Sequence, residues 1–364
     1  MCLYLGNKKP LVAKKDIVVY KYVESSDGNY KTPFHAFPVK VNTLMIAEGG
    51  SGDITKENCE KYSIHGGAIH ACTSSNDSDF KGTTCLKAII KKGTEFWVQD
   101  DFKQVAARSL YITDEVVEQE ETSDLQDIYI SILESVEEHK NGLKVGDVLL
   151  ADKTYVSSLN EFDHSKAIAV VMGFHPEDDS PICVAMKESY LPLFRRFEGV
   201  NVNSCQSNIK RSEDLKKDFD GYKHTYDIAN ANDYNADLFK AIDHCINYAT
   251  EGTNKGDWHL GAGGEMIMLA QNLTIVNASI LLNNIGTPIS MLGFWTSSQY
   301  RDGQDVYSWY VTLDNGDSIA TQTGCSVYGC IRPLLSLKKC KHTYIKRFCN
   351  KLLNYVKDNM YVLK

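Results

Sequence analysis

Several features that would assign this chain to a protein class are missing from it. The 364 residues carry 39 Lys and Arg against 47 Asp and Glu, and the net charge of −8 excludes a general nucleic-acid binder. No apolar run approaches the ~18 residues that a membrane-spanning helix requires. Lys8, Lys9 and Pro10 interrupt the N-terminal segment before a signal-peptide core is complete. We therefore expect a protein synthesised in the cytoplasm without a signal peptide or a membrane span, a description that also fits a virion protein released by lysis.

Paired metal-ligand spacings are also scarce. The 11 cysteines are odd in number and scattered, and no C-x-x-C occurs, which favours free thiols over a disulfide framework. One region gathers soft ligands, namely Cys59, His65, His70, Cys72 and Cys85. Zinc needs four such ligands, commonly in short paired spacings, and only His70 and Cys72 form a close pair here. We predict no metal and no cofactor, with a structural metal in this region as the weaker alternative.

The first block, residues 1–113, is predicted to be a small β-rich domain. Its most regular β-branched and aromatic run, 16–23, predicts a strand. A turn at Gly93 separates two further strand-like runs, 87–90 and 94–98, and this arrangement predicts a hairpin.

An acidic connector is predicted over 114–142. Residues 114–138 hold ten carboxylates and no Lys or Arg, and a like-charged run of this kind usually stays solvated. Ile128, Ile130 and Ile132 alternate within it, so part of the connector is also compatible with a short strand.

The third block, residues 143–337, begins with strand signals and continues with helical ones. The stretch 145–156 predicts a hairpin, and the short apolar run 165–174 predicts a buried strand. Apolar residues then recur at helical spacing over 239–249 and 264–273, which predicts two amphipathic helices. Strand-like sequence completes the block.

Aromatic and small residues form four distinctive phrases in the second half of this block. They read Asp257-Trp258-His259-Leu260-Gly261-Ala262-Gly263-Gly264-Glu265-Met266, Phe294-Trp295-Thr296-Ser297-Ser298-Gln299, Tyr307-Ser308-Trp309-Tyr310-Val311 and Cys330-Ile331-Arg332-Pro333. With them, 143–337 resembles the C-type-lectin fold of formylglycine-generating-enzyme-like domains and of the variable proteins of diversity-generating retroelements, including phage tropism determinants and bacteroidal proteins. The resemblance implies an α+β chain in which a small β-rich N-terminal domain precedes a C-type-lectin-like ligand-binding domain.

The resemblance also implies recognition rather than catalysis. In such variable proteins the segment after the Trp-Thr-Ser-Ser phrase builds a ligand-facing surface, here expected to bind a cell-surface protein or glycan, as in phage receptor binding or adhesion. The N-terminal domain would attach this surface to a larger virion or surface assembly, and a homo-oligomer is compatible with that role. No enzyme activity and no nucleic-acid partner are expected.

The expected binding surface lies in 299–307 and 318–328. Tyrosine gives a large contact area at low entropic cost, while Ser, Gly, Asp and Gln supply adaptable hydrogen bonds, although the same residues also fill ordinary loops. By resemblance, Trp295, Trp309 and Arg332 belong to the scaffold. The residues assigned to ligand binding, and to retroelement-driven variation, are Gln299, Tyr300, Arg301, Asp302, Gln304, Asp305, Tyr307, Ser318, Ala320, Gln322, Gly324, Cys325, Ser326 and Tyr328.

Cys325 and Cys330 indicate an enzyme as the alternative function. Formylglycine-generating enzymes carry two catalytic cysteines at this offset, which bind copper(I), and soft thiolates suit that ion. The phrases around both cysteines depart from the enzyme pattern, because Cys330 runs into Ile331-Arg332-Pro333 and no Gly-Gly-Ser precedes Cys325. We therefore keep a copper oxygenase as the second choice.

The last segment, residues 338–364, is predicted to be a basic amphipathic helix. Its apolar residues recur at helical spacing, and the segment contains eight Lys and Arg but only one Asp. Such a helix either packs on its own domain or docks on a partner or an anionic surface.

Overall fold

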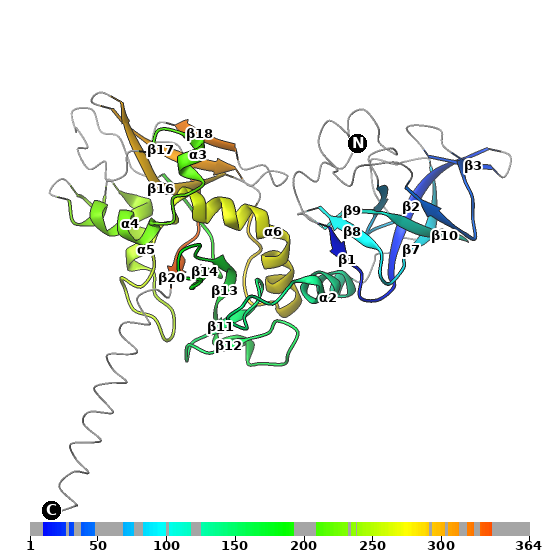
Figure 1. The fold of residues 1–364 in the computed structure, drawn as a ribbon, viewed down its shortest axis with the longest axis horizontal. Helices are drawn as coiled ribbons and strands as arrows, with labels where there is room; N and C mark the ends of the chain where they lie inside the picture. Colours follow the sequence, from blue (N-terminus) through cyan, green and yellow to red (C-terminus); the bar gives the residue numbers. More distant parts are fainter. Residues whose placement is uncertain are drawn as a thin grey trace, which may run out of the picture.

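The structure is a computed structural model of the chain (Figure 1). It describes residues 10–26, 29–32, 38–47, 68–75, 83–99, 102–117, 125–192, 209–231, 234–237, 239–290, 293–302, 305–312, 319–323 and 328–336. The helix predicted over 338–364 lies outside the described residues, and so do Cys59 and His65.

The N-terminal part is one antiparallel sheet of ten strands. Eight of them follow the order β1-β8-β9-β6-β2-β7-β10-β5, while β3 pairs with β2 and β4 pairs with β3. The strand predicted over 16–23 is confirmed as β2, in which Ile17, Val19 and Val23 enter the main core of this sheet. The strands are β1 (Leu11–Val12), β2 (Ile17–Ser26), β3 (Asn29–Lys31), β4 (Pro38–Val39), β5 (Thr43–Ile46), β6 (Ile69–Cys72), β7 (Thr84–Ile90), β8 (Glu95–Val98), β9 (Gln104–Ala107) and β10 (Ser109–Val116).

The turn at Gly93 exists, but the strands on its two sides are not partners. Gly93 has a φ of +88°, which a glycine adopts without steric cost. β7 pairs with β2 and β10, whereas β8 pairs with β9 and with β1, where Leu11 lies opposite Phe96. The predicted hairpin is therefore wrong, because β2 and β10 occupy both positions beside β7 in the sheet.

The acidic segment contains a helix rather than a strand. α2 (Leu125–Ser135) buries Ile128, Tyr129, Ile132 and Leu133, which recur at helical and not at alternating positions. These side chains join the core of the N-terminal sheet together with Ala278 of the C-terminal part. The strand prediction for Ile128, Ile130 and Ile132 was wrong because it overlooked the neighbouring Tyr129 and Leu133, which complete the helical face.

The C-terminal part holds two five-stranded sheets. The first has the antiparallel order β12-β11-β13-β14-β20, and the second has the order β15-β19-β16-β17-β18 with one parallel pair, β16 and β19. The predicted hairpin over 145–156 and buried strand over 165–174 are confirmed as β11–β12 and β13. The strands are β11 (Val148–Leu150), β12 (Tyr155–Val156), β13 (Ala167–Phe174), β14 (Pro181–Ala185), β15 (Ser189–Pro192), β16 (Gly293–Asp302), β17 (Asp305–Thr312), β18 (Ile319–Thr323), β19 (Tyr328–Ile331) and β20 (Leu334–Ser336).

α6 (Gly263–Asn283) packs between these two sheets. Met266, Leu269 and Leu273 share one core with Val170 of β13 and Phe294 of β16. The helix predicted over 264–273 is confirmed, but it continues to Asn283 and ends at Asn284 in the left-handed conformation that commonly terminates helices. α6 is long and apolar enough to cross a membrane by composition, yet 67% of its apolar stretch is buried inside the protein, as expected of a core helix.

Short helices cover the second sheet on its other face. Ile228, Phe239 and Ile242 pack there against Trp295 and Ile331. The helix predicted over 239–249 is confirmed as α5. The remaining helices are the 3-10 helix η2 (His164–Lys166), α3 (Ser212–Leu215), α4 (Gly221–Ala229) and α5 (Lys240–Asn247).

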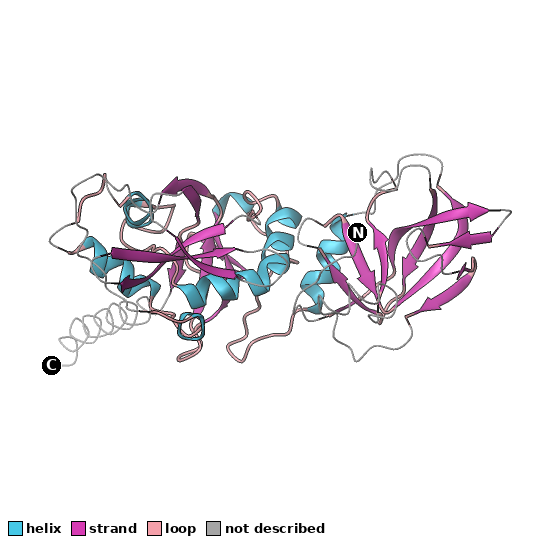
Figure 2. Ribbon diagram, turned by 90° about the horizontal axis from the view of Figure 1, so that it is seen from above, coloured by secondary structure: helices cyan, strands magenta, loops and turns pink. Residues whose placement is uncertain are grey.

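The fold class predicted from the sequence is wrong. An α+β chain with a C-type-lectin-like domain was expected, but the described chain is β-rich, with a ten-stranded and two five-stranded sheets and only a few helices. Nearly all strand pairs are antiparallel, and most helices are short connections at the sheet faces (Figure 2). The class was misjudged because the pairing that joins short strands such as β12 or β20 into sheets is not visible in a local sequence pattern.

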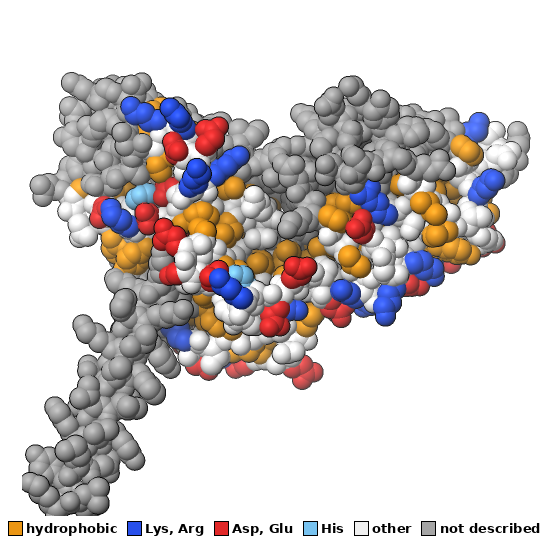
Figure 3. All heavy atoms as spheres, viewed as in Figure 1, with side chains coloured by type: hydrophobic (Ala, Val, Ile, Leu, Met, Phe, Trp, Pro, Cys, Tyr) orange, Lys and Arg blue, Asp and Glu red, His pale blue; other side chains and the backbone are white. Residues whose placement is uncertain are grey.

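The coloured part of the face drawn in Figure 3 shows no large area of one charge. On the face in Figure 3, acidic and basic side chains are interspersed with neutral and hydrophobic ones over the coloured part of the molecule. The net charge of −8 is therefore not concentrated on that visible face.

Lys21 generates a prediction about pH and stability. It lies on β2 with 9% of its surface exposed and donates to the carbonyl of His70 at 2.7 Å. Burial lowers the pKa of Lys21 from 10.5 to about 8. Since the unfolded chain holds this proton more tightly, the contribution of Lys21 to stability is greatest above pH 10.5 and is lost as the pH falls through about 8.

We expect Lys21→Met to stabilise the protein at pH 7 by up to about 3 kcal/mol, less whatever the lost hydrogen bond contributed. Urea unfolding at pH 7, 8, 9 and 10 measures this difference. The advantage of the variant should shrink toward pH 10, and the exposed-site variant Lys40→Met should show no such trend. A constant difference between Lys21→Met and wild type across this range would contradict the assignment.

Candidate functional site

The structure brings most of the predicted ligand-binding residues it describes onto neighbouring strands. In the β16–β17 hairpin, Tyr300 lies opposite Tyr307 and Asp302 lies opposite Asp305, with Arg301 between them on β16. Gln304 lies outside the described residues. β17 and β18 then form the outer edge of the second sheet.

Two more of these residues lie on the edge strand β18. Ala320 is paired with Val311 of β17, and Gln322 is paired with Trp309. Tyr328 begins β19, on the other side of β16, and is therefore separated from β18 by two strands. Ser318, Gly324, Cys325 and Ser326 lie outside the described residues.

Gln299 and Tyr300 mark the boundary between the buried base of the hairpin and its outer end. Gln299 is 2% exposed, and its carbonyl accepts a hydrogen bond from the backbone N–H of Ile209 at 3.0 Å. Tyr300 is half-buried, with its ring centroid 6.4 Å from that of Trp309. The structure thus places Gln299 in the base, whereas the strand ends beyond Tyr300 extend away from it.

The base of the hairpin is fixed by buried hydrogen bonds around a bulge. The pairing of β16 with β17 shifts register between Trp295 and Gln299. Within this bulge, Thr296 donates through Oγ1 to the carbonyl of Trp309 at 3.0 Å, and Ser308 Oγ donates to the carbonyl of Thr296 at 3.0 Å. Trp295 and Trp309 are both buried, as predicted for the scaffold.

Ser298, also in the bulge, ties the hairpin to the start of α6. Its hydroxyl accepts the backbone N–H of Gly263 at 2.8 Å and donates to Oδ2 of Asp218 at 2.5 Å. The carbonyl of Asp218 accepts the N–H of Gly264 at 2.9 Å. Two otherwise unpaired N–H groups in the first turn of α6 are thereby satisfied by residues from outside the helix.

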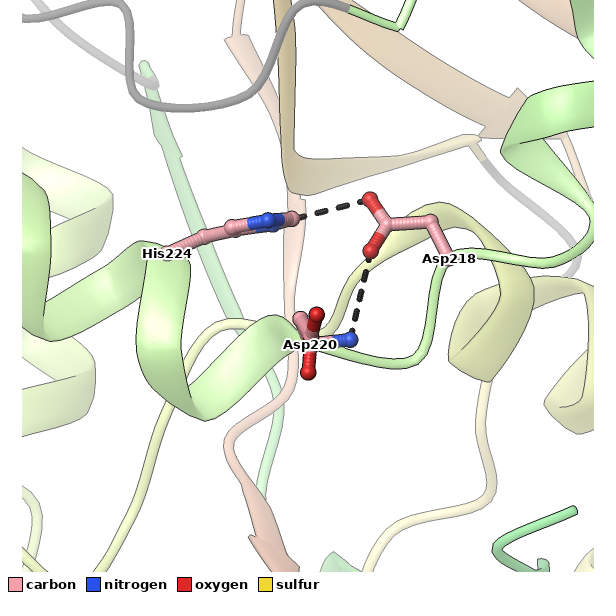
Figure 4. A group of neighbouring side chains, drawn as sticks. All are labelled: Asp218, Asp220 and His224. Carbon is pink, nitrogen blue, oxygen red and sulfur yellow. Dashed lines mark hydrogen bonds and ion pairs between the residues drawn. The ribbon is translucent and has the colours of Figure 1, made fainter. Parts of the chain in front are cut away.

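Asp218 belongs to a cluster with Asp220 and His224 at the start of α4 (Figure 4). One ligand atom from each residue lies within 4.8 Å of the others, and Nδ1 of His224 is 3.5 Å from Oδ2 of Asp218. Burial raises the pKa of Asp218, and the nearby Glu265 adds to this, while His224 and the hydrogen bond from Ser298 oppose it. Among the residues described, these three form the one group of His, Cys or carboxylate side chains positioned to hold a metal ion.

A second buried histidine–carboxylate pair lies beside this cluster. Nε2 of His259 is 3.3 Å from both carboxylate oxygens of Glu265, and the two side chains are 0% and 1% exposed. Glu265 also accepts the backbone N–H of Ala262 at 2.7 Å, which caps the start of α6. The N-terminal end of α6 is therefore surrounded by buried polar groups.

Four other residues that the sequence singled out are buried, namely Cys72, Cys85, Cys330 and Arg332. Cys330 is 1% exposed, and burial raises the pKa of its thiol to about 11. Arg332 is also buried and donates to the carbonyl and hydroxyl of Thr287 in the loop after α6. Cys72 and Cys85 are buried, and no ligand group of three forms around them in the described part of the N-terminal sheet.

Asp218, Asp220 and His224 were not among the candidate residues predicted from the sequence. Their spacing carried a usable signal, since Asp220 and His224 are four residues apart and thus share one face of a helix. The contacts that make them distinctive come from Ser298 and Glu265, which are far away in the sequence.

Ser308 provides a test of the fixed hairpin base. It is 0% exposed, and its hydroxyl lies within hydrogen-bond distance of the carbonyls of Thr296 and Ser298. Ser308→Ala leaves buried carbonyls without that donor, so we expect the free energy of unfolding to fall by about 1–3 kcal/mol. Denaturant unfolding measures this, with the exposed Ser212→Ala as the matched control expected to stay within about 0.5 kcal/mol of wild type. Equal stability of the two variants would show that the hydroxyl does not hold the bulge.

Comparisons with known proteins do not assign this chain to a family. No protein-family model and no curated protein matches this sequence. Among solved structures, the crystal structure of a fimbrial protein from Bacteroides ovatus is similar, with a TM-score of 0.43 and 11% sequence identity. The similarity covers 88% of this chain and 64% of the other, so this chain spans less than two thirds of that protein. A likeness this distant does not establish a shared fold or function.

Proposed function

We propose that this protein recognises a ligand, a protein or glycan on a cell surface, through the β16–β17 hairpin and the neighbouring edge strand β18. The role is that of an adhesin or receptor-binding protein. Binding rather than chemical conversion of the ligand is its activity in this proposal.

The arrangement of the hairpin is the observation that carries the proposal. Its base is held by buried hydrogen bonds from Thr296, Ser298 and Ser308, and its strands continue past Tyr300, beyond the positions at which β18 and β19 pair with them. A rigid base with a protruding end suits recognition, because a preorganised surface loses less conformational entropy on binding. Binding residues are commonly carried on such projecting segments of a fixed scaffold.

The residue types at the outer end suit the same role. Tyr300, Arg301, Asp302, Asp305 and Tyr307 lie on paired positions of the two strands. Tyrosine and arginine are enriched at binding hot spots, and aspartate adds polar contacts that orient a partner. Glycans and polar protein surfaces both offer hydroxyl, amide or carboxylate groups to these side chains.

The N-terminal sheet has a supporting role in this proposal. It joins the binding part to a larger virion or surface assembly. α2 supports such a link, since its side chains pack in the core of the N-terminal sheet together with Ala278 of α6 (Figure 1). Because the N-terminal sheet and the C-terminal part are in packed contact, a force on one part is transmitted to the other. The orientation of one part relative to the other is also fixed by this contact.

The copper oxygenase considered as the alternative has less support. A copper(I) site needs accessible thiolates, and low-pKa thiols occur near positive charge or at exposed positions. Cys330 is 1% exposed, its pKa is raised by burial, and its Sγ lies 3.4 Å from the hydroxyl of Ser290. Cys325 lies outside the described residues. We therefore retain binding as the proposal.

The binding proposal is tested with fluorescently labelled full-length protein on a panel of intact bacterial cells. We expect saturable binding to some strains, and we expect the variant Arg301→Ala/Asp302→Ala/Tyr307→Ala to bind at least about tenfold more weakly, equivalent to 1.4 kcal/mol. Periodate or protease treatment of the cells distinguishes a glycan from a protein ligand.

Tyr190→Ala is the matched control for this experiment. Tyr190 is 59% exposed on β15, at the opposite edge of the same sheet. It should leave binding unchanged. Binding by the triple variant at wild-type strength, or an equal loss in the Tyr190 variant, would reject the hairpin as the binding surface.

We further propose that the ligand-binding positions are diversified by a retroelement. The proposal predicts that substitutions among natural copies of the gene concentrate in codons 299–328, at positions that match adenines in a nearby template copy. Amplicon sequencing of the locus across a source population measures this. Substitutions spread evenly over the gene would remove the diversification proposal and leave ligand binding to be judged by the cell assay.

A further inference from the structure

The cluster of Asp218, Asp220 and His224 has the geometry of a metal site. All three side chains come from one short segment, the loop before α4 and the first turn of that helix, and Figure 4 shows the His224 ring directed toward the Asp218 carboxylate. Their ligand atoms lie within 4.8 Å of one another. Ligand atoms around one tetrahedral cation at about 2.0–2.2 Å are separated by roughly 3.3–3.6 Å, so these side chains have to move closer by about 1 Å to share an ion.

His224 supplies an independent sign that a ligand is expected there. Its side chain is 8% exposed, and its Nδ1 atom is buried without a hydrogen-bond partner among the described residues. Leaving a buried polar atom unpaired costs about 1–3 kcal/mol, so most such atoms in folded proteins have a partner. The nearest acidic atom is Oδ2 of Asp218 at 3.5 Å, beyond an ordinary hydrogen bond.

The negative charge around the cluster also favours a bound cation. Asp218 and Glu265 are 8% and 1% exposed, and their ion-pair partners among the described residues are His224 and His259. Neither carboxylate is paired with a lysine or arginine within the described chain, and a histidine carries a full charge only when it is protonated. Buried carboxylates are stabilised when a fixed positive charge is close by, and a divalent ion supplies two.

We propose that Asp218, Asp220 and His224 bind one divalent transition-metal ion of the Zn²⁺ class. A set of one imidazole and two carboxylates suits Zn²⁺ or Mn²⁺, whereas Ca²⁺ and Mg²⁺ prefer oxygen ligands alone. Asp220 is exposed, which leaves one side of the site open to solvent for entry of the ion and for a bound water.

Ser298 gives the site a supporting hydrogen bond. Its hydroxyl donates to Oδ2 of Asp218 at 2.5 Å and so orients the carboxylate, as outer partners of metal ligands usually do. The backbone N–H of Asp220 donates to the other oxygen of Asp218 at 3.2 Å. The ion would pin the loop before α4 onto the start of α6 and onto β16. This role is structural and does not depend on the ligand-binding proposal.

Metal titration of the purified full-length chain tests the site, after treatment with a chelator and under reducing conditions. ZnCl₂ is added in a calorimeter, and Co²⁺ serves as a spectroscopic probe. We expect one saturable equivalent with d–d absorption and without the thiolate charge-transfer band that a cysteine site would give. Asp220→Asn should lose that equivalent or bind it at least about tenfold more weakly.

Asp220→Asn is chosen because the Asp220 side chain makes no capping hydrogen bond, so the variant should fold. The exposed Asp214→Asn in α3 is the matched control and should bind like wild type. A thermal midpoint raised by ZnCl₂ in wild type and the control, but not in Asp220→Asn, would support the structural role. The proposal is overturned if wild type shows no saturable equivalent, if Asp220→Asn binds as wild type does, or if the bound Co²⁺ shows thiolate charge transfer.

Discussion

The burial of α6 between the two C-terminal sheets is the constraint on which the other features of this half depend. The helix contributes Met266, Leu269 and Leu273 to the core shared by both sheets, so its axial position and rotation are fixed by packing. Its first turn has little free space. A Cβ atom on Gly263 would lie 2.1 Å from Leu215, and one on Gly264 would lie 2.6 Å from the carbonyl of Asp218. Glycine at the first two positions of α6 therefore permits the close approach of Leu215 and of the Asp218 carbonyl to the helix.

Close packing at the start of α6 buries backbone N–H groups, which then need hydrogen-bond acceptors. The first N–H groups of a helix have no partner inside the helix, and in a buried position they must find one elsewhere. Ser298 and the carbonyl of Asp218 satisfy Gly263 and Gly264, and Glu265 satisfies Ala262. These hydrogen bonds to the start of α6 bring carboxylates and histidines together in one buried place. An ion pair or a metal ion is required there to balance the negative charge of the carboxylates.

Local signals in the sequence predicted individual elements well. β2, β13, α5 and the start of α6 follow from β-branched runs and from helical spacing, which depend on neighbouring residues alone. The failures involve partners distant in the chain. β8 pairs with β1 instead of β7, and α2 is helical because its apolar face reaches the core of a different part of the chain. The class was misjudged for the same reason, since sheet membership is decided by such pairings.

The candidate site shows the same division between local and distant information. Residue types predicted Tyr300 and its neighbours as surface-forming, and their places on one hairpin follow from local strand pairing. The bond between Ser298 and Asp218 joins residues 80 positions apart, so no window of sequence contains both. That bond matters for function because Ser298 lies in the bulge that begins the hairpin. Because Ser298 donates to Asp218, the buried polar network at the start of α6 is directly connected to the base of the β16–β17 hairpin.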